Sequence, residues 1–177
     1  MDKLTALWKG AAYQDHLLQS YRKLNIILQS ALLGIGMWLF MVMGRFGHSV
    51  TDWLTYWLLA AVTALALYVM WTMKRLIAAR SEDVNYYHNQ IMEAEQSLPK
   101  EQQVLTAFKV YQKYGRKETA TTSFFLNFEL TPAIQKQLIE KGSGHTRKLL
   151  DRNVPIGFLC IWVFLHIVAF VNFYIFS

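Results

Sequence analysis

Two apolar stretches decide the fold: IILQSALLGIGMWLFMVM, from Ile26 to Met43, and LTYWLLAAVTALALYVMWTM, from Leu54 to Met73. Neither contains a charged residue, and each has about the length of the roughly 20-residue helix that crosses a bilayer core. Inside hydrocarbon every backbone amide must be bonded within the protein, so such stretches are expected to be helices. A third apolar stretch runs from Val154 to Phe176. The sequence therefore predicts an all-α integral membrane protein with three transmembrane helices.

The short polar connection between the first two stretches makes them antiparallel neighbours, a transmembrane helical hairpin over residues 26–73. An amphipathic helix, cytoplasmic or interfacial, is predicted for residues 1–25. Residues 74–152 are predicted to form a helical cytoplasmic subdomain, and residues 153–177 the third transmembrane helix. At 177 residues with three spans, the chain has room for one modest soluble subdomain.

The formal charge of +6 is distributed unevenly along the chain. Apart from Arg45, every Lys and Arg lies before Ile26 or between Lys74 and Arg152. The positive-inside rule then places the N-terminus and residues 74–152 in the cytoplasm and the C-terminus outside. Compactness and the absence of targeting features favour a bacterial inner membrane. The basic excess indicates topology and anionic lipid; because acidic residues are interleaved with it, no nucleic-acid partner is expected.

Helical spacing continues outside the apolar stretches. The N-terminal helix has Trp and Leu on one side, so it can lie in the membrane interface, which we favour, or pack on the cytoplasmic subdomain. The second span is predicted to continue as one helix towards Leu98, with Pro99 ending it. A further helix is expected with Val104, Leu105, Phe108 and Tyr111 on one face, and Thr131-Pro132 is expected to begin a short one.

Small residues on the first two spans supply surfaces for close helix packing. Ser30, Gly34 and Gly36 lie on the first span, and Ala60 and Ala64 on the second. The Ser30/Gly34 and Ala60/Ala64 pairs have the small-xxx-small spacing that lets helix backbones approach in lipid. This spacing is compatible with a homodimer contact, but we favour packing within the hairpin.

Three polar residues inside the spans form a candidate intramembrane polar site: His166, Asn172 and Gln29. A polar or ionisable side chain in a span usually faces protein or a water-filled cavity rather than lipid. His166 is interpreted either as a proton-relay or pore-lining residue or, as we favour, as a neutral histidine bonded to a neighbouring helix through Gln29, Ser30 or Thr63.

A cluster of phenylalanines, Phe124, Phe125 and Phe128, makes the segment around it a candidate docking surface. The alternatives are packing in the helical core, docking on the membrane surface, and contact with a protein partner. Of these we favour core packing.

Catalytic signatures are missing from the sequence. The acidic pairs Ser81-Glu82-Asp83 and Glu93-Ala94-Glu95 are explained by helix solvation. Of the five histidines, three belong to the cytoplasmic side, one to the outer turn and one to the third span. Neither a Cys/His zinc pattern nor a phosphate-binding glycine loop is present. We expect no catalytic residue, no cofactor and no metal site, and hence no enzyme.

The sequence favours a non-enzymatic inner-membrane protein that acts as an assembly, accessory or regulatory subunit of a membrane complex through its cytoplasmic helices. The expected partners are the lipid bilayer and either further copies of the chain or other membrane proteins. The alternative is a homo-oligomeric channel or membrane-perturbing effector gated by the cytoplasmic subdomain, with His166, Asn172 and Gln29 lining the pore.

Overall fold

The computed structural model describes residues 2–43, 50–114, 131, 133–134, 138 and 149–175 of the chain. These residues form the helices α1 (Lys3–Met43), α2 (Val50–Glu95), α3 (Val104–Tyr114) and α7 (Val154–Ile175), with a short 3₁₀ turn η1 (Lys100–Gln102) and a π-helical turn η2 (Leu149–Asn153). Within the described ranges there is no strand, as predicted.

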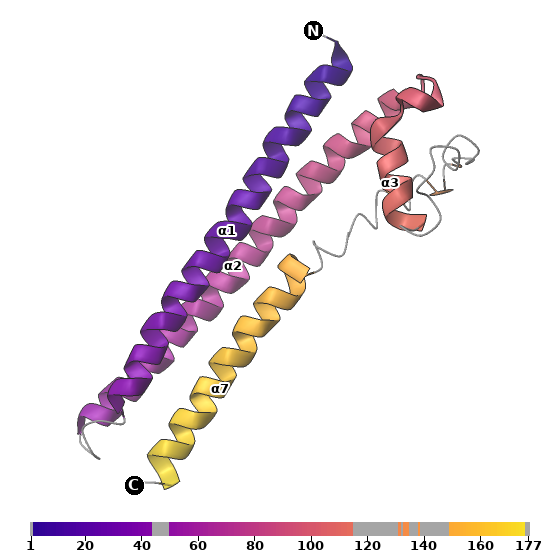
Figure 1. Cartoon of the computed structure of the whole chain (residues 1–177). Helices are drawn as coiled ribbons and strands as arrows, with labels where there is room; N and C mark the ends of the chain where they lie inside the picture. The colour runs from indigo at the N-terminus through magenta and orange to yellow at the C-terminus, as the bar shows by residue number, and fades with distance from the viewer. Residues whose placement is uncertain are drawn as a thin grey trace. The chain divides into compact units, whose positions relative to one another are not determined.

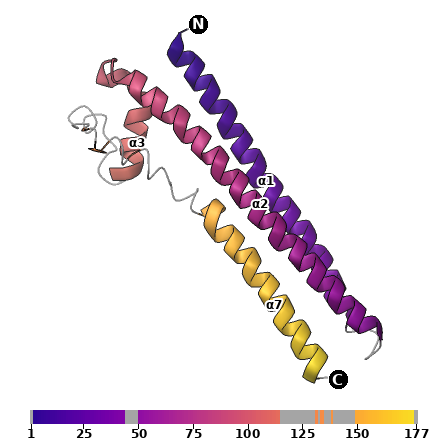
Figure 2. The same ribbon diagram turned by 180° about the vertical axis from the view of Figure 1, so that it is seen from behind.

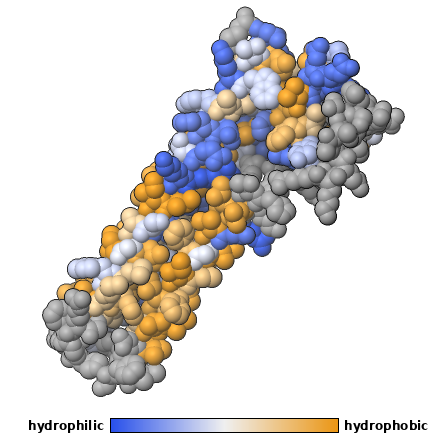
Figure 3. All heavy atoms as spheres, in the orientation of Figure 1, coloured by the Kyte–Doolittle hydropathy of each residue, from blue (hydrophilic) through white to orange (hydrophobic). Residues whose placement is uncertain are grey.

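Three of these helices are long and apolar enough to cross a membrane: α1, α2 and the helix that begins with η2 and continues as α7. The first two predicted apolar stretches lie within α1 and α2, and the third forms α7 as far as Ile175. Large apolar side chains on these helices, including Trp38, Leu65 and Phe164, are exposed, and the visible surface over the apolar stretches is mainly hydrophobic (Figure 3). This surface is compatible with a membrane location.

The chain folds as two compact units, each assembled from segments that are distant in sequence. Unit 1 comprises Met1–Leu18 and Ala78–Thr146, and unit 2 comprises Gln19–Ile77 and Arg147–Ser177. The predicted boundaries followed the ends of the apolar stretches. Unit 2 begins at Gln19, about two helical turns before the first apolar stretch, and the polar residues Arg22 and Asn25 in between are buried in it.

Unit 2 is a three-helix packing of α1, α2 and α7, in which α1 and α2 lie side by side in both views (Figures 1 and 2). Its core consists of buried residues from all three helices: Leu39, Leu59, Ala66, Trp162, Leu165 and Ala169. The buried positions of α1 in this unit are Arg22, Asn25, Gln29, Gly36 and Leu39. They recur at intervals of three, four and seven residues, which is the heptad spacing of helices packed side by side at a shallow angle.

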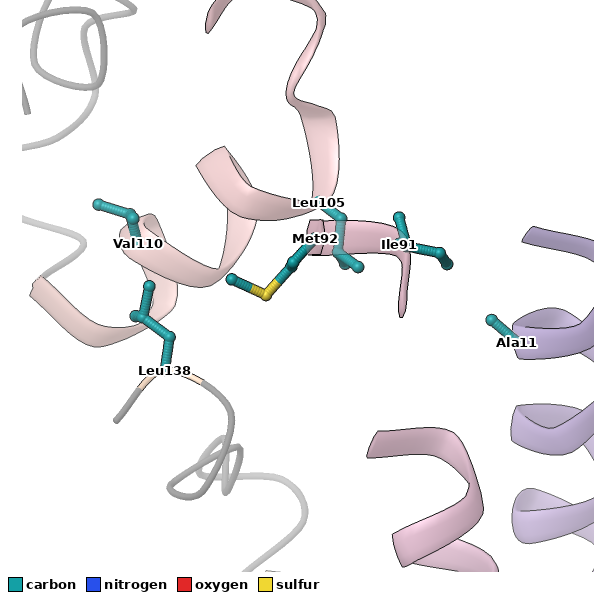
Figure 4. Packing of buried hydrophobic residues seen from close by; sticks show 6 residues of the cluster. All are labelled: Ala11, Ile91, Met92, Leu105, Val110 and Leu138. Atoms are coloured by element: carbon teal, nitrogen blue, oxygen red, sulfur yellow. The ribbon is translucent and has the colours of Figure 1, made fainter. Parts of the chain in front are cut away.

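Unit 1 has a core of its own, in which Ile91 and Met92 of α2 meet Leu105 and Val110 of α3 (Figure 4). Ala11 of α1 and Leu138 complete its buried residues. Leu4 and Leu7 also pack against this core. Leu4, Leu7 and Ala11 of the N-terminal helix therefore pack on protein, as in the second of the two predicted arrangements, whereas Trp8 is exposed. The interfacial position of this helix stays a prediction.

The predicted helix boundaries around Pro99 are largely confirmed. The helix α2 continues without interruption past the second apolar stretch and ends at Glu95, close to the predicted Leu98.

The helix start predicted at Thr131-Pro132 has the expected cap. The Thr131 hydroxyl accepts a hydrogen bond from the Ile134 amide at 3.3 Å, so Thr131 is the N-cap of the short helix predicted there.

The four residues predicted to lie on one face of the helix that follows Pro99 differ in burial. Leu105 is buried, whereas Val104, Phe108 and Tyr111 are exposed. The buried face of α3 is formed by Leu105, Thr106, Lys109 and Val110. The reason is a contact that fixes the first turn of α3 and that the apolar spacing does not reveal.

That contact is made by the Glu95 carboxylate, which is 1% exposed at the end of α2. Glu95 Oε1 accepts a hydrogen bond from the Leu105 amide, and Oε2 accepts one from the Thr106 amide, both at 2.9 Å. The Thr106 hydroxyl donates a third to Oε2 at 2.7 Å. A carboxylate from one helix thus caps the N-terminus of the next, where backbone amides are otherwise unpaired and negative charge is favoured.

Candidate functional site

Gln29 joins α1 to α2 near the middle of unit 2. Its side chain is 1% exposed, and its amide nitrogen donates a hydrogen bond to the backbone carbonyl of Ala66 at 2.9 Å. Because Ala66 lies on an apolar helix, this bond fixes the register of the two antiparallel helices at one point. A buried polar residue at a core position of paired helices is known to specify register in this way.

His166 makes a comparable contact between α7 and α2. Its Nε2 lies 2.9 Å from the Thr63 hydroxyl, and the ring of Tyr56 packs edge-on against the imidazole with centroids 6.2 Å apart. The Thr63 hydroxyl also lies 2.9 Å from the Leu59 carbonyl and can donate to it. With that donation, Thr63 is left to accept from the imidazole N–H. The arrangement can therefore hold α7 against α2 without a charged histidine.

The Arg22–Asp151 ion pair connects α1 to η2 at the other end of the apolar region. The Arg22 Nε donates to Asp151 Oδ1 at 2.7 Å and the terminal nitrogen donates to Oδ2 at 2.6 Å, a two-bond fork. The Arg22 side chain is 8% exposed and that of Asp151 is 26% exposed. Fork geometry and partial burial make this pair stronger than an ordinary surface ion pair.

The predicted small residues have different environments. A Cβ added at Gly36 would lie 2.7 Å from two ring carbons of Trp162, so the glycine admits the indole ring against α1. A Cβ added at Gly34 would meet nothing within 4 Å. Ser30 and Ala64 are exposed and Ala60 is half-buried. Within the single chain, close helix packing therefore uses Gly36 and not the Ser30/Gly34 pair.

Two further predictions fall outside what the structure describes. Asn172 belongs to α7, but its side chain is not among the described ones. The predicted docking segment with Phe124, Phe125 and Phe128 also lies outside the described residues. Neither prediction gains or loses support.

α3 presents an exposed apolar stripe, made of three of the residues that the sequence predicted to lie on one face. The α3 stripe consists of Val104, Phe108 and Tyr111, spaced at i, i+4 and i+7, and its exposed fractions are 64%, 51% and 36%. Residues at these intervals lie on one side of a helix. The opposite side of α3 is held by Glu95 and the core of unit 1, so the stripe is presented outward on an anchored helix.

Sequence reasoning missed Glu95, Arg22 and Asp151. Glu95 carried one signal: an acidic residue in the last turn of a helix is unfavourable for the helix dipole, so it needs another reason to be there. The Arg22–Asp151 ion pair has no sequence signal of this kind, because its partners are 129 residues apart.

The polar contacts described in unit 2 join helices to one another. Among the residues that the structure describes, no group of three or more His, Cys, Asp or Glu side chains has the arrangement of a metal site. Comparison of the chain with protein-family models, curated proteins and solved structures finds no match in any of the three.

Proposed function

We propose that this chain is a non-enzymatic membrane subunit that assembles with a protein partner, as an accessory or regulatory component of a membrane complex, through the helices of unit 1. In this proposal α1, α2 and α7 anchor the protein in a bacterial inner membrane. Unit 1 and the N-terminus lie in the cytoplasm and the C-terminus lies outside.

The α3 stripe is the observation that carries the proposal. Three apolar side chains at i, i+4 and i+7 on an exposed helix face have the pattern by which a helix binds in the apolar groove of another protein. Aromatic residues dominate the energy of such contacts, which makes Phe108 the expected centre of the interface. The Glu95 cap supports this assignment, because an anchored helix loses little conformational entropy on binding.

The contacts in unit 2 favour assembly over the channel alternative. A channel would need Gln29 and His166 to line an aqueous path. In the structure Gln29 is buried against the Ala66 carbonyl and His166 is bonded to Thr63. Both residues therefore hold helices together. To line a pore, Gln29 would have to give up its bond to Ala66 and His166 its bond to Thr63.

Site-specific photocross-linking in native membranes tests the proposal. A photoreactive phenylalanine analogue at position 108 is expected to yield one adduct of defined mass, identified by mass spectrometry. The same analogue at Glu93, an exposed residue of α2 in the same unit, is the matched control and is expected to yield none. The adduct should disappear when Val104 and Tyr111 are both replaced by Ser.

Native mass spectrometry after gentle extraction separates the two functions. A stoichiometric complex with another protein, lost in Phe108→Ser but kept in Glu93→Ser, supports the assembly proposal. A closed homo-oligomer without partners, which conducts ions in liposomes and loses conductance in His166→Ala, would overturn it in favour of the channel.

A further inference from the structure

The formal charge of the chain resides in unit 2. That unit contains eight of the 18 Lys and Arg residues and two of the 12 Asp and Glu residues, so it carries the whole +6 while unit 1 is formally neutral. All of the eight except Arg45 adjoin the same end of the apolar stretches, before the first, after the second or before the third. Because the excess positive charge belongs to unit 2, which contains the apolar helices, an anionic partner is expected to bind to that unit.

Contacts within unit 2 bring these basic residues to one level along the helices. From the Gln29–Ala66 bond, seven residues back along α1 lead to Arg22 and seven residues forward along the antiparallel α2 lead to Met73. Lys23 is adjacent to Arg22 and Lys74 is adjacent to Met73. The two lysines therefore lie at about the same height along the helix axes. The ion pair with Arg22 then brings Asp151 to this level, and Arg152 follows it directly.

The members of this set differ in how much of their charge is available. Arg22 is buried and its charge is balanced by Asp151. Lys23, Lys74, Arg75 and Arg152 are exposed. The guanidinium of Arg75 lies 4.8 Å from the ring centroid of Trp71, a stacking contact that holds it at the end of the apolar stretch.

We propose that Lys23, Lys74, Arg75 and Arg152, here called the basic belt, bind the phosphate groups of anionic phospholipids. The belt lies where three apolar helices end, which is the depth of the headgroups for a chain that spans the bilayer. Each member is exposed at that level with a stem that can run along the helix surface. Lipid phosphates fit this position better than soluble phosphate, because their acyl chains bind to the exposed apolar surface below the belt.

Spin-labelled lipids measure this selection directly. The full chain is reconstituted in phosphatidylcholine vesicles that contain a trace of either spin-labelled phosphatidylglycerol or spin-labelled phosphatidylcholine, and the protein-bound fraction of each is compared. We expect phosphatidylglycerol to be enriched severalfold at low salt and less so at high salt. The Lys74→Gln/Arg75→Gln variant should lose most of this enrichment, because it lacks two of the four charges of the belt.

A matched variant controls for the total charge. Lys3→Gln/Lys100→Gln removes two exposed charges from unit 1 and is expected to keep the selectivity of the unchanged protein. Equal enrichment of both labelled lipids, or an equal loss in the two variants, would overturn the proposal. Displacement of the labelled lipid by inorganic phosphate, beyond that caused by chloride at the same ionic strength, would also overturn it, since the belt would then bind phosphate irrespective of the lipid.

Discussion

Removal of the Glu95 carboxylate is the sharpest test of how α3 is held. In Glu95→Ala the buried amides of Leu105 and Thr106 lose their acceptor together with the Thr106 hydroxyl, three hydrogen bonds in all. Each buried amide left unpaired costs about 1–3 kcal/mol. The free energy of opening α3 should therefore fall by about 3–5 kcal/mol. Glu95→Gln retains one acceptor oxygen and should cost only about 1–2 kcal/mol.

Hydrogen exchange of the full chain, followed by mass spectrometry of peptides covering α3, measures this opening. A loss of about 3 kcal/mol corresponds to an exchange rate raised about a hundredfold or more in Glu95→Ala. Glu93→Ala is the matched control: its side chain is exposed on the same helix, and its effect should stay within about 0.5 kcal/mol. The capping argument fails if α3 stays fully protected in Glu95→Ala, or if Glu93→Ala exposes it equally.

Two further predictions concern unit 2, and both are read from thermal unfolding of the purified chain in detergent. Gly36→Ala should lower the melting temperature because its Cβ would lie 2.7 Å from the Trp162 ring, whereas Gly34→Ala should leave it unchanged or raise it; equal effects would refute the packing argument. Arg22→Gln and Asp151→Asn should each destabilise unit 2 by about 1–3 kcal/mol. Exchanging the two charges should recover part of this loss, and no recovery would show that the pair does not act as a pair.

The sequence predicted the features of this fold that depend on local spacing. Uncharged apolar stretches of the right length are helices, and α2 continues past its apolar stretch because no breaker occurs before Pro99. The N-cap at Thr131 follows from the same kind of local rule, since a hydroxyl directly before a proline favours a helix start.

The side of α3 that packs against the core could not be predicted in this way. Its apolar residues occur almost all round the helix, so spacing alone allows more than one buried face. The choice depends on Glu95, ten residues before Leu105, and an acidic residue near a helix end has an equally good explanation in solvation.

The candidate site in unit 2 was predicted mainly as residue types. For His166 the sequence also offered three partners, of which Thr63 is the one within hydrogen-bonding distance. The choice among them, and the partner of Gln29, depend on the register between helices. Register is set jointly by many contacts between distant segments. The acceptor of the Gln29 bond is the backbone carbonyl of Ala66. Every residue has such a carbonyl, so the residue type does not reveal which one is used.

The separation of Arg22 from Asp151 has a consequence for how the protein is made. After Arg22 the ribosome adds a further 129 residues, the last of them Asp151, which takes on the order of ten seconds. During that interval the first two helices must persist as a hairpin with an arginine that lacks its carboxylate. Arg22 lies four residues before the first apolar stretch, where its guanidinium can still be hydrated. The unpaired charge therefore costs little energy until Asp151 is present. A partner deeper in the helix would have required both halves of the pair to enter the bilayer together. Because Arg22 lies at the end of the apolar stretch, α7 can pack against the hairpin after it has been synthesised and form the ion pair then.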